Sequence, residues 1–156
     1  MGRLGADARL RELGIELPHA PEPFGAYVPA VQTGNLLFLT GMLPTVGHEA
    51  KVRGRVGTEL DADAGRRAAV LAAMNALAVA RAHLGSLDKV SRVVRLTVFI
   101  ATSGEAVDMP RIADGASEVL RDVFGADRMS ARSVIGVASL PLDVPVELEV
   151  TLEVET

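Results

Sequence analysis

One arginine near the end of the chain stands where it could bind an anion. Arg132 follows Ser130 and Ala131, and only Ser133 separates it from the apolar run Val134–Val137. A guanidinium is a planar fork that can hold a carboxylate through two parallel hydrogen bonds. An arginine beside a strand is, however, more often an ordinary surface residue. Taken alone, Arg132 is therefore a candidate carboxylate ligand and no more.

The end of the chain alternates strictly between apolar and polar side chains. Its two faces are Val146, Leu148, Val150, Leu152 and Val154, against Glu147, Glu149, Thr151, Glu153 and Glu155. Period two over ten residues predicts a half-buried strand. Pro141 and Pro145 block a helix and separate this strand from the preceding apolar run. A row of glutamates on one face of a strand is usually solvated surface.

Other kinds of reactive site find little support. His19, His48 and His83 have no spacing typical of metal ligands, and no metal site is predicted. The chain has no cysteine, which excludes disulfides and thiolate chemistry. It has no GxSxG motif, and no histidine lies near Ser130 or Ser133 in the sequence.

A small basic loop surrounds a GxxG motif at residues 54–57. Lys51, Arg53 and Arg55 supply its charge, but the Walker lysine pattern is missing. A solvated, flexible loop is favoured over a phosphate site.

Length and charge restrict the class of protein. With 156 residues, the chain suits one domain spanning 1–156. A net charge of −4 and an aromatic content of 3% argue against a nucleic-acid partner, which usually requires a basic face and stacking side chains. No signal peptide or membrane span is recognisable. The lack of cysteine makes the cytoplasm the default location.

The first half of the chain predicts an arm, a hairpin and a long helix. Residues 1–25 form an N-terminal helical arm, with an amphipathic helix at 6–13 and a proline-rich end. Strands are expected at 27–31, an edge strand because of Pro29, and at 36–40. Residues 45–60 are expected to be a mobile loop with a short strand near Val52 or Val56.

The elements from residue 61 onwards predict a sheet with helices on one face. A helix at 61–84 begins at acidic caps and has only Asn75, Arg81 and His83 as polar residues beyond Ala68. So apolar a helix must lie on a sheet and touch a second helix. The central strand is expected at 90–100, and the second helix from Asp108 and Pro110 to Gly125. Its apolar stripe faces away from Asp114.

This order predicts an α+β fold in which two helices pack on one face of the sheet. The second face of the sheet is half apolar and uncovered. We therefore expect self-association into a closed ring or a symmetric dimer.

Several segments resemble the YjgF/Rid family, also labelled endoribonuclease L-PSP. The most specific are Ala131-Arg132-Ser133, Leu140-Pro141 and Val146-Glu147-Leu148-Glu149, which match the closing signature of the family. Supporting matches are Tyr27, Gly34-Asn35-Leu36, Thr40-Gly41, Asn75 and Leu77, and residues 84–90. The resemblance runs from Tyr27 to Val154 and covers most of the chain.

The resemblance implies a fold, an assembly and an activity. The fold would be chorismate-mutase-like, of the bacillus type, with a mixed β-sheet. The assembly would be a homotrimer with ligand clefts between subunits. The activity would be that of a 2-iminobutanoate/2-iminopropanoate deaminase, which hydrolyses reactive enamine and imine acids to 2-keto acids and ammonia without a cofactor.

The same resemblance implies roles for individual residues. Arg132 would clamp the substrate carboxylate, while Glu147 and the backbone carbonyl of Val134 would orient the attacking water. Thr40 stands at the family's serine, and Tyr27 would line the cleft from the adjoining subunit. The sequence departs from the family pattern at Met42, where glutamine is usual, at Val134, where cysteine is common, and at Asp114, near an asparagine of many deaminases. A carboxylate at 114 would oppose an anionic substrate unless it is protonated or paired.

Three functions remain open at this point. The first is the imine deaminase, and the second is a protein that binds a small carboxylate metabolite without turnover, which Met42 and Asp114 favour somewhat. The third and weakest is an endoribonuclease or translation inhibitor. Arg132 could also be purely structural, in an intersubunit ion pair with Glu147 or Glu149.

Overall fold

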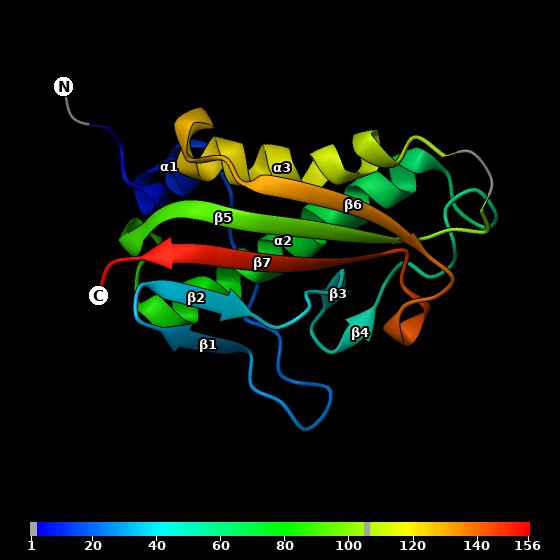
Figure 1. Cartoon of the computed structure of the whole chain (residues 1–156), viewed down its shortest axis with the longest axis horizontal. Helices are drawn as coiled ribbons and strands as arrows, with labels where there is room; N and C mark the ends of the chain where they lie inside the picture. The colour runs from blue at the N-terminus through cyan, green and yellow to red at the C-terminus, as the bar shows by residue number, and fades with distance from the viewer. Residues whose placement is uncertain (1–2, 105–106) are drawn as a thin grey trace.

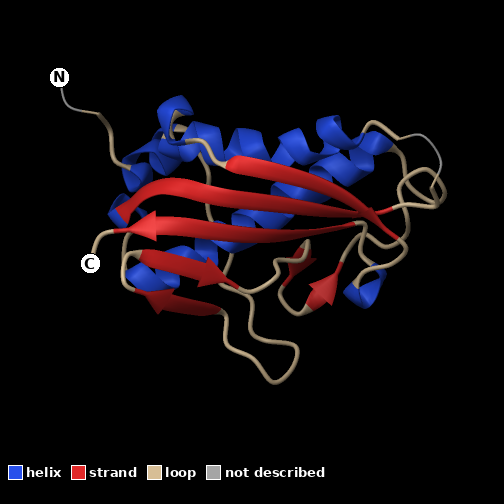
Figure 2. Cartoon of the chain, in the orientation of Figure 1, coloured by secondary structure: helices blue, strands red, loops and turns tan. Residues whose placement is uncertain are grey.

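A five-stranded sheet carries both long helices on one side in the computed structural model, which describes residues 3–104 and 107–156 (Figures 1 and 2). The strands, in their order across the sheet, are β1 (Ala30–Thr33), β2 (Leu36–Leu39), β7 (Val146–Val154), β5 (Val90–Ala101) and β6 (Ala131–Val137). The helices are α1 (Ala6–Glu12), α2 (Ala62–Leu84) and α3 (Met109–Phe124), and a small hairpin pairs β3 (Thr45–Val46) with β4 (Glu49–Ala50). Only β5 and β6 are parallel within the large sheet, so this sheet is mixed. The predicted α+β fold is confirmed.

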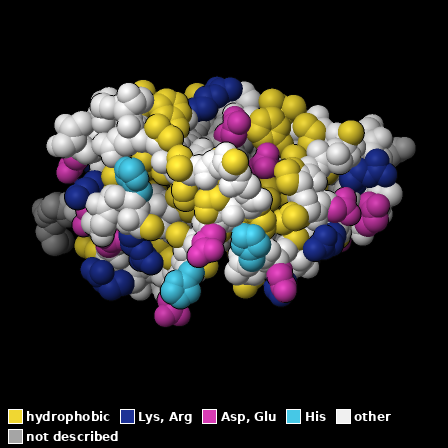
Figure 3. Space-filling view, turned by 90° about the horizontal axis from the view of Figure 1, so that it is seen from below, with side chains coloured by type: hydrophobic (Ala, Val, Ile, Leu, Met, Phe, Trp, Pro, Cys, Tyr) yellow, Lys and Arg dark blue, Asp and Glu magenta, His cyan; other side chains and the backbone are white. Residues whose placement is uncertain are grey.

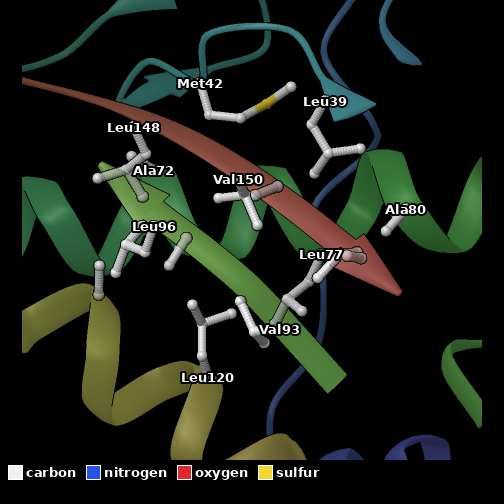
Figure 4. Close-up of a cluster of buried hydrophobic side chains, with 14 of the residues drawn as sticks. Leu39, Met42, Ala72, Leu77, Ala80, Val93, Leu96, Leu120, Leu148 and Val150 are labelled. Atoms are coloured by element: carbon white, nitrogen blue, oxygen red, sulfur yellow. The ribbon is translucent and has the colours of Figure 1, made fainter. Parts of the chain in front are cut away.

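The core lies between the sheet and the two long helices. The apolar face of β7 is buried along its whole length, as the alternation predicted. Figure 4 shows Leu148 and Val150 of β7 beside Leu96 of β5, with Leu77 of α2 and Leu120 of α3 in the same cluster. Small alanines on α2 allow this helix to lie close to both the sheet and α3.

The helix boundaries follow the predicted caps. Asp61 accepts a hydrogen bond from the backbone N–H of Ala64 at 2.8 Å, and Gly85 ends α2 in the left-handed region at φ 86°. Asp108 caps α3 in the same way, and Gly125 follows its last residue. These local signals were sufficient because each cap depends on residues within one turn of the helix.

Several predicted elements differ from the structure. The edge strand begins at Ala30 rather than Tyr27, because Pro29 cannot donate to the ladder and only its carbonyl pairs, accepting from Thr40 N at 2.9 Å. The central strand is β7, and β5 lies between β7 and β6. The segment 45–60 contains the β3–β4 hairpin and a buried Val56, which bridges Leu60 and Thr102. In the arm, only residues 6–12 are helical, and Met1 and Gly2 lie outside the described residues.

Asn75 fastens α2 to the segment that leads into β3. This side chain is 2% exposed, and its Nδ2 donates to the carbonyl oxygens of Leu43 at 2.8 Å and Thr45 at 2.9 Å. We expect Asn75→Ala to lower the free energy of unfolding by about 1–3 kcal/mol, because two buried acceptors lose their donor. Urea unfolding would measure this. The exposed Arg67→Ala on the same helix is the control, with an expected change below about 0.5 kcal/mol, and an equal effect of both variants would contradict the prediction.

Candidate functional site

Arg132 points to the helix side of the sheet. Its partner in the parallel ladder is Leu96, whose side chain is fully buried under the helices. Arg132 Nη1 donates to Asp114 Oδ1 at 2.7 Å and to Ser117 Oγ at 3.1 Å, both on α3. The side chain of Arg132 is 26% exposed and that of Asp114 is 48% exposed. The guanidinium is thus held against α3 and still reaches solvent.

One edge of this guanidinium remains available. Within the described residues, Nε and Nη2 of Arg132 have no hydrogen-bond acceptor, since both hydrogen bonds of this side chain start from Nη1. Nε and Nη2 form the side edge of the fork, which matches the two oxygens of a carboxylate. A ligand carboxylate can therefore bind without displacing Asp114.

The carbonyl of Val134 points out of the open edge of the sheet. Strand β6 pairs with β5 alone, and Thr102 N donates to the carbonyl of Val137 from the β5 side at 2.9 Å. Successive carbonyls on a strand point in opposite directions, so the carbonyl of Val134 is directed away from β5. Since Arg132 is two residues away on the same strand, the edge presents a cation and a free acceptor together.

Tyr27 and Thr40 line a pocket near the start of the sheet. Its wall includes Pro23 and Phe24, from the arm that precedes β1. The Tyr27 hydroxyl accepts from the backbone N–H of Phe24 at 2.8 Å, which holds this turn closed. The space-filling view from below shows hydrophobic side chains gathered near the centre of this side, with histidines and carboxylates beside them (Figure 3).

Glu147 lies next to this pocket on the open face of the sheet. A methyl group added to Gly41, which lines the pocket, would lie 3.1 Å from Cδ and Oε1 of Glu147. Partial burial raises the pKa of the Glu147 carboxyl above its ordinary value, and the negative charge of Glu149 raises it further. A carboxylate with a raised pKa is a better proton acceptor than an ordinary glutamate.

A single chain does not bring these two groups together. Arg132 pairs with the inward-facing Leu96, whereas Glu147 pairs with Phe99 on the opposite face. The Cα atoms of Arg132 and Glu147 are roughly 14 Å apart, because two strand spacings across the sheet and three residues along the strands separate them. The structure therefore divides the residues that the resemblance assigned to one site: Tyr27, Thr40 and Glu147 lie in one region, and Arg132 with Val134 lies in another. Asp114 joins Arg132.

The chain matches the model of the family described as "YjgF/chorismate mutase-like, putative endoribonuclease" over residues 7–151. It belongs to this family. Among YjgF relatives, TCP17 of Trypanosoma cruzi is 37% identical over 97% of this chain and 94% of that protein. A 2-iminobutanoate/2-iminopropanoate deaminase of Dermatophagoides farinae is 32% identical over 90% of this chain and 95% of that protein.

The fold also matches a solved structure. A crystal structure from Shewanella oneidensis MR-1, which carries the endoribonuclease name, has a TM-score of 0.91 and 25% identity. The alignment covers 97% of this chain and all of that chain. The predicted family and its chorismate-mutase-like α+β fold are therefore confirmed.

Two features of the YjgF site escaped the sequence reasoning. Ser117, the second partner of Arg132, was not predicted, although its i, i+3 spacing from Asp114 puts both on one face of α3. Met42 was regarded as a change in the site, but its side chain is 2% exposed and packs in the core (Figure 4). Met42 thus belongs to the core and also lines the pocket of Tyr27 and Thr40.

Residues 3–104 and 107–156 contain neither a cluster of metal ligands nor a helix that could span a membrane. Within these ranges no three histidine, aspartate or glutamate side chains gather as a metal site would require. Among the same residues, no helix combines the length and the hydropathy needed to cross a membrane.

Proposed function

We propose that the protein hydrolyses 2-imino acids to 2-keto acids and ammonia. The observation that carries this proposal is the free Nε–Nη2 edge of Arg132 beside the outward carbonyl of Val134. A carboxylate held by the fork places the adjacent C2 atom near a water on that carbonyl. The deaminase name of the Dermatophagoides farinae relative supports the same reaction.

The proposed reaction needs only an oriented water and a proton relay. The water oxygen forms a bond to C2 while the C=N π electrons move to nitrogen, and the Glu147 carboxylate accepts a proton from the water. Glu147 then returns this proton to the nitrogen, which gives a carbinolamine. The hydroxyl proton of the carbinolamine passes to the nitrogen by the same carboxylate, the C–N bond breaks, and ammonia leaves as the C=O bond forms. Positioning and general base assistance can each contribute about two to four orders of magnitude.

A complete site needs two copies of the chain. Arg132 and Val134 would come from one subunit, and Glu147, Thr40 and Tyr27 from its neighbour, because the sheet separates the two groups within a chain. The half-apolar open face, on which Val31, Phe38 and Ile135 are exposed, suits such an assembly. We propose the homotrimer as its form.

Ammonia release from 2-imino acids, generated in situ by an amino-acid oxidase, tests this function. We expect the wild type to exceed the uncatalysed rate and Arg132→Ala to lose roughly 100-fold of this activity, because the substrate is no longer positioned. Arg132→Lys keeps the charge without the fork and should fall between them. Equal rates for wild type and Arg132→Ala, with both folded, would refute the proposal.

A second candidate is a carboxylate-binding protein without turnover. The Arg132–Asp114 ion pair favours it, because the clamp already holds one carboxylate. Binding of a 2-keto acid, with no ammonia release from any imine, would support this alternative. The endoribonuclease in the family description remains the weakest candidate for a chain with a net charge of −4, and salt-dependent RNA binding would revive it.

A further inference from the structure

We propose that Phe24 and His48 form a latch that limits the size of the ligand side chain admitted to the pocket of Tyr27 and Thr40. The latch holds residues 21–27, called the pocket turn below, against the β3–β4 hairpin. A small side chain fits while the latch is closed, whereas a longer one has to open it. The inference rests on the proposed function for the class of ligand, a 2-imino or 2-keto acid, but the latch does not depend on the reaction.

The pocket turn makes no hydrogen bond to the rest of the molecule. Its own hydrogen bonds are internal: the Tyr27 N–H donates to the carbonyl of Gly25 at 3.0 Å, and the Phe24 N–H donates to the Tyr27 hydroxyl at 2.8 Å. Within the described residues, no hydrogen bond joins residues 21–27 to another segment. Figure 1 shows this part of the chain as a loop that projects below the sheet ahead of β1. A segment without backbone hydrogen bonds to its surroundings opens at a lower free energy than a helix or a central strand.

An aromatic contact joins the pocket turn to the hairpin. The ring centroids of Phe24 and His48 are 4.0 Å apart, with 34° between the ring planes. His48 stands at the tip of the hairpin, between β3 and β4. Paired aromatic rings contribute stability beyond the area that they bury. Because Phe24 is 37% exposed, this contact lies at the surface and can break without opening the core.

With the latch closed, the pocket has room for little more than a methyl group. Its volume is about 20 Å³, and one water molecule needs about 10–15 Å³. The wall opposite the pocket turn includes Met42 and Leu43, which are buried in the core. Side chains in a packed core resist displacement, so the pocket turn is the wall that yields. A branched side chain such as isobutyl therefore requires the latch to open.

Tyr27 provides a direct readout of the pocket turn, because the chain has one tyrosine and no tryptophan. Quenching of its fluorescence by acrylamide would be compared in wild type and His48→Ala, which removes the ring of the latch. His48→Phe keeps an aromatic ring, and His19→Ala removes an exposed histidine outside the pocket. We expect a larger quenching constant in His48→Ala and the wild-type value in both controls. Equal quenching in all of these proteins would overturn the inference.

Binding of 2-keto acids to the full-length protein tests the size limit without turnover. Titration calorimetry would compare pyruvate, whose side chain is a methyl group, with 4-methyl-2-oxopentanoate, whose side chain is isobutyl. We expect wild type, His48→Phe and His19→Ala to bind pyruvate roughly 10-fold more tightly than the longer acid. In His48→Ala this preference should shrink by roughly 5-fold, because the aromatic contact no longer opposes opening.

Two further results would overturn the inference: an equal size preference in wild type and His48→Ala, or no binding of either 2-keto acid at millimolar concentrations. Failure of the proposed hydrolysis is a separate result. If no imino acid releases ammonia while His48→Ala changes both quenching and size preference, the deaminase is rejected and the latch is upheld. Hydrolysis by the wild type with the same size preference in every variant would uphold the deaminase and reject the latch.

Discussion

Replacing Glu147 with glutamine is expected to lower the rate of imine hydrolysis by about two to four orders of magnitude. Glutamine keeps the shape and the place beside Gly41, but it cannot accept a proton from the attacking water. The loss should therefore appear in kcat, with little change in KM, because carboxylate binding depends on Arg132. Steady-state ammonia release over a range of imine concentrations would separate the two constants.

The pH dependence of the wild type provides a second readout for Glu147. Only the deprotonated carboxylate is a base, so the rate should fall as the pH drops through its pKa. Burial and the neighbouring Glu149 raise this pKa, which places the acid limb of the profile above the ordinary value of 4.5. Glu149→Gln removes the like charge and should shift the limb to lower pH. A limb that does not move in Glu149→Gln would contradict the assignment.

The free energy of unfolding should also depend on the titration of Glu147, and the raised pKa of this carboxyl sets the direction of the dependence. The folded state favours protonated Glu147, so its contribution is fully present at low pH and is lost as the pH rises through the raised pKa. We therefore expect Glu147→Gln to be more stable than wild type at pH 7, with a difference that vanishes below about pH 4. Thermal denaturation of both proteins at pH 7 and below about pH 4 would measure this difference. A Glu147→Gln variant that is less stable than wild type at both pH values would indicate a general folding defect.

Coexpression of Arg132→Ala with Glu147→Gln is expected to restore activity that neither variant has alone. A site between subunits is intact when the Arg132 side comes from the Glu147→Gln chain and the Glu147 side comes from the Arg132→Ala chain. Random assembly of equal amounts makes about a quarter of the sites intact, since each condition holds for half of the chains. Ammonia release from the purified mixed oligomer would measure this fraction.

A matched mixture decides between shared and separate sites. Wild type coexpressed with the double variant Arg132→Ala/Glu147→Gln should retain about a quarter of full activity if sites are shared, but about half if each chain carries its own site. No recovery in the first mixture together with half activity in the second would show that one chain holds a complete site. That result would also require Arg132 and Glu147 to meet, which their opposite faces prevent in this structure.

Local patterns predicted the elements of the fold well, and long-range pairing limited the rest. The limits of α2 followed from Asp61 and Gly85, and the buried face of β7 followed from its alternation. The start of β1 was wrong, because pairing with β2 decides where a strand begins. The position of β7 at the centre of the sheet could not be read from its sequence, since neighbours across a sheet are set by the topology of the whole chain.

In the candidate site, too, individual residues were predictable from the sequence, whereas contacts between distant residues were not. Arg132 and Glu147 were found through motif resemblance, while the ion pair of Arg132 with Asp114 joins residues 18 positions apart on different elements. The sequence raised the requirement that Asp114 be protonated or paired, but it could not identify the partner. Only the packing of α3 against β6 brings the two side chains together.

The outward carbonyl of Val134 belongs to the main chain, and this has an evolutionary consequence. In the proposed site, the water ligand at this position persists whatever side chain residue 134 carries, provided that β6 keeps its edge geometry. Sequence drift from cysteine to valine can therefore be neutral for catalysis, and an alanine scan would miss the group completely. Replacement of the amide by an ester between residues 134 and 135, which weakens the carbonyl as an acceptor, is the substitution to which such a group is sensitive.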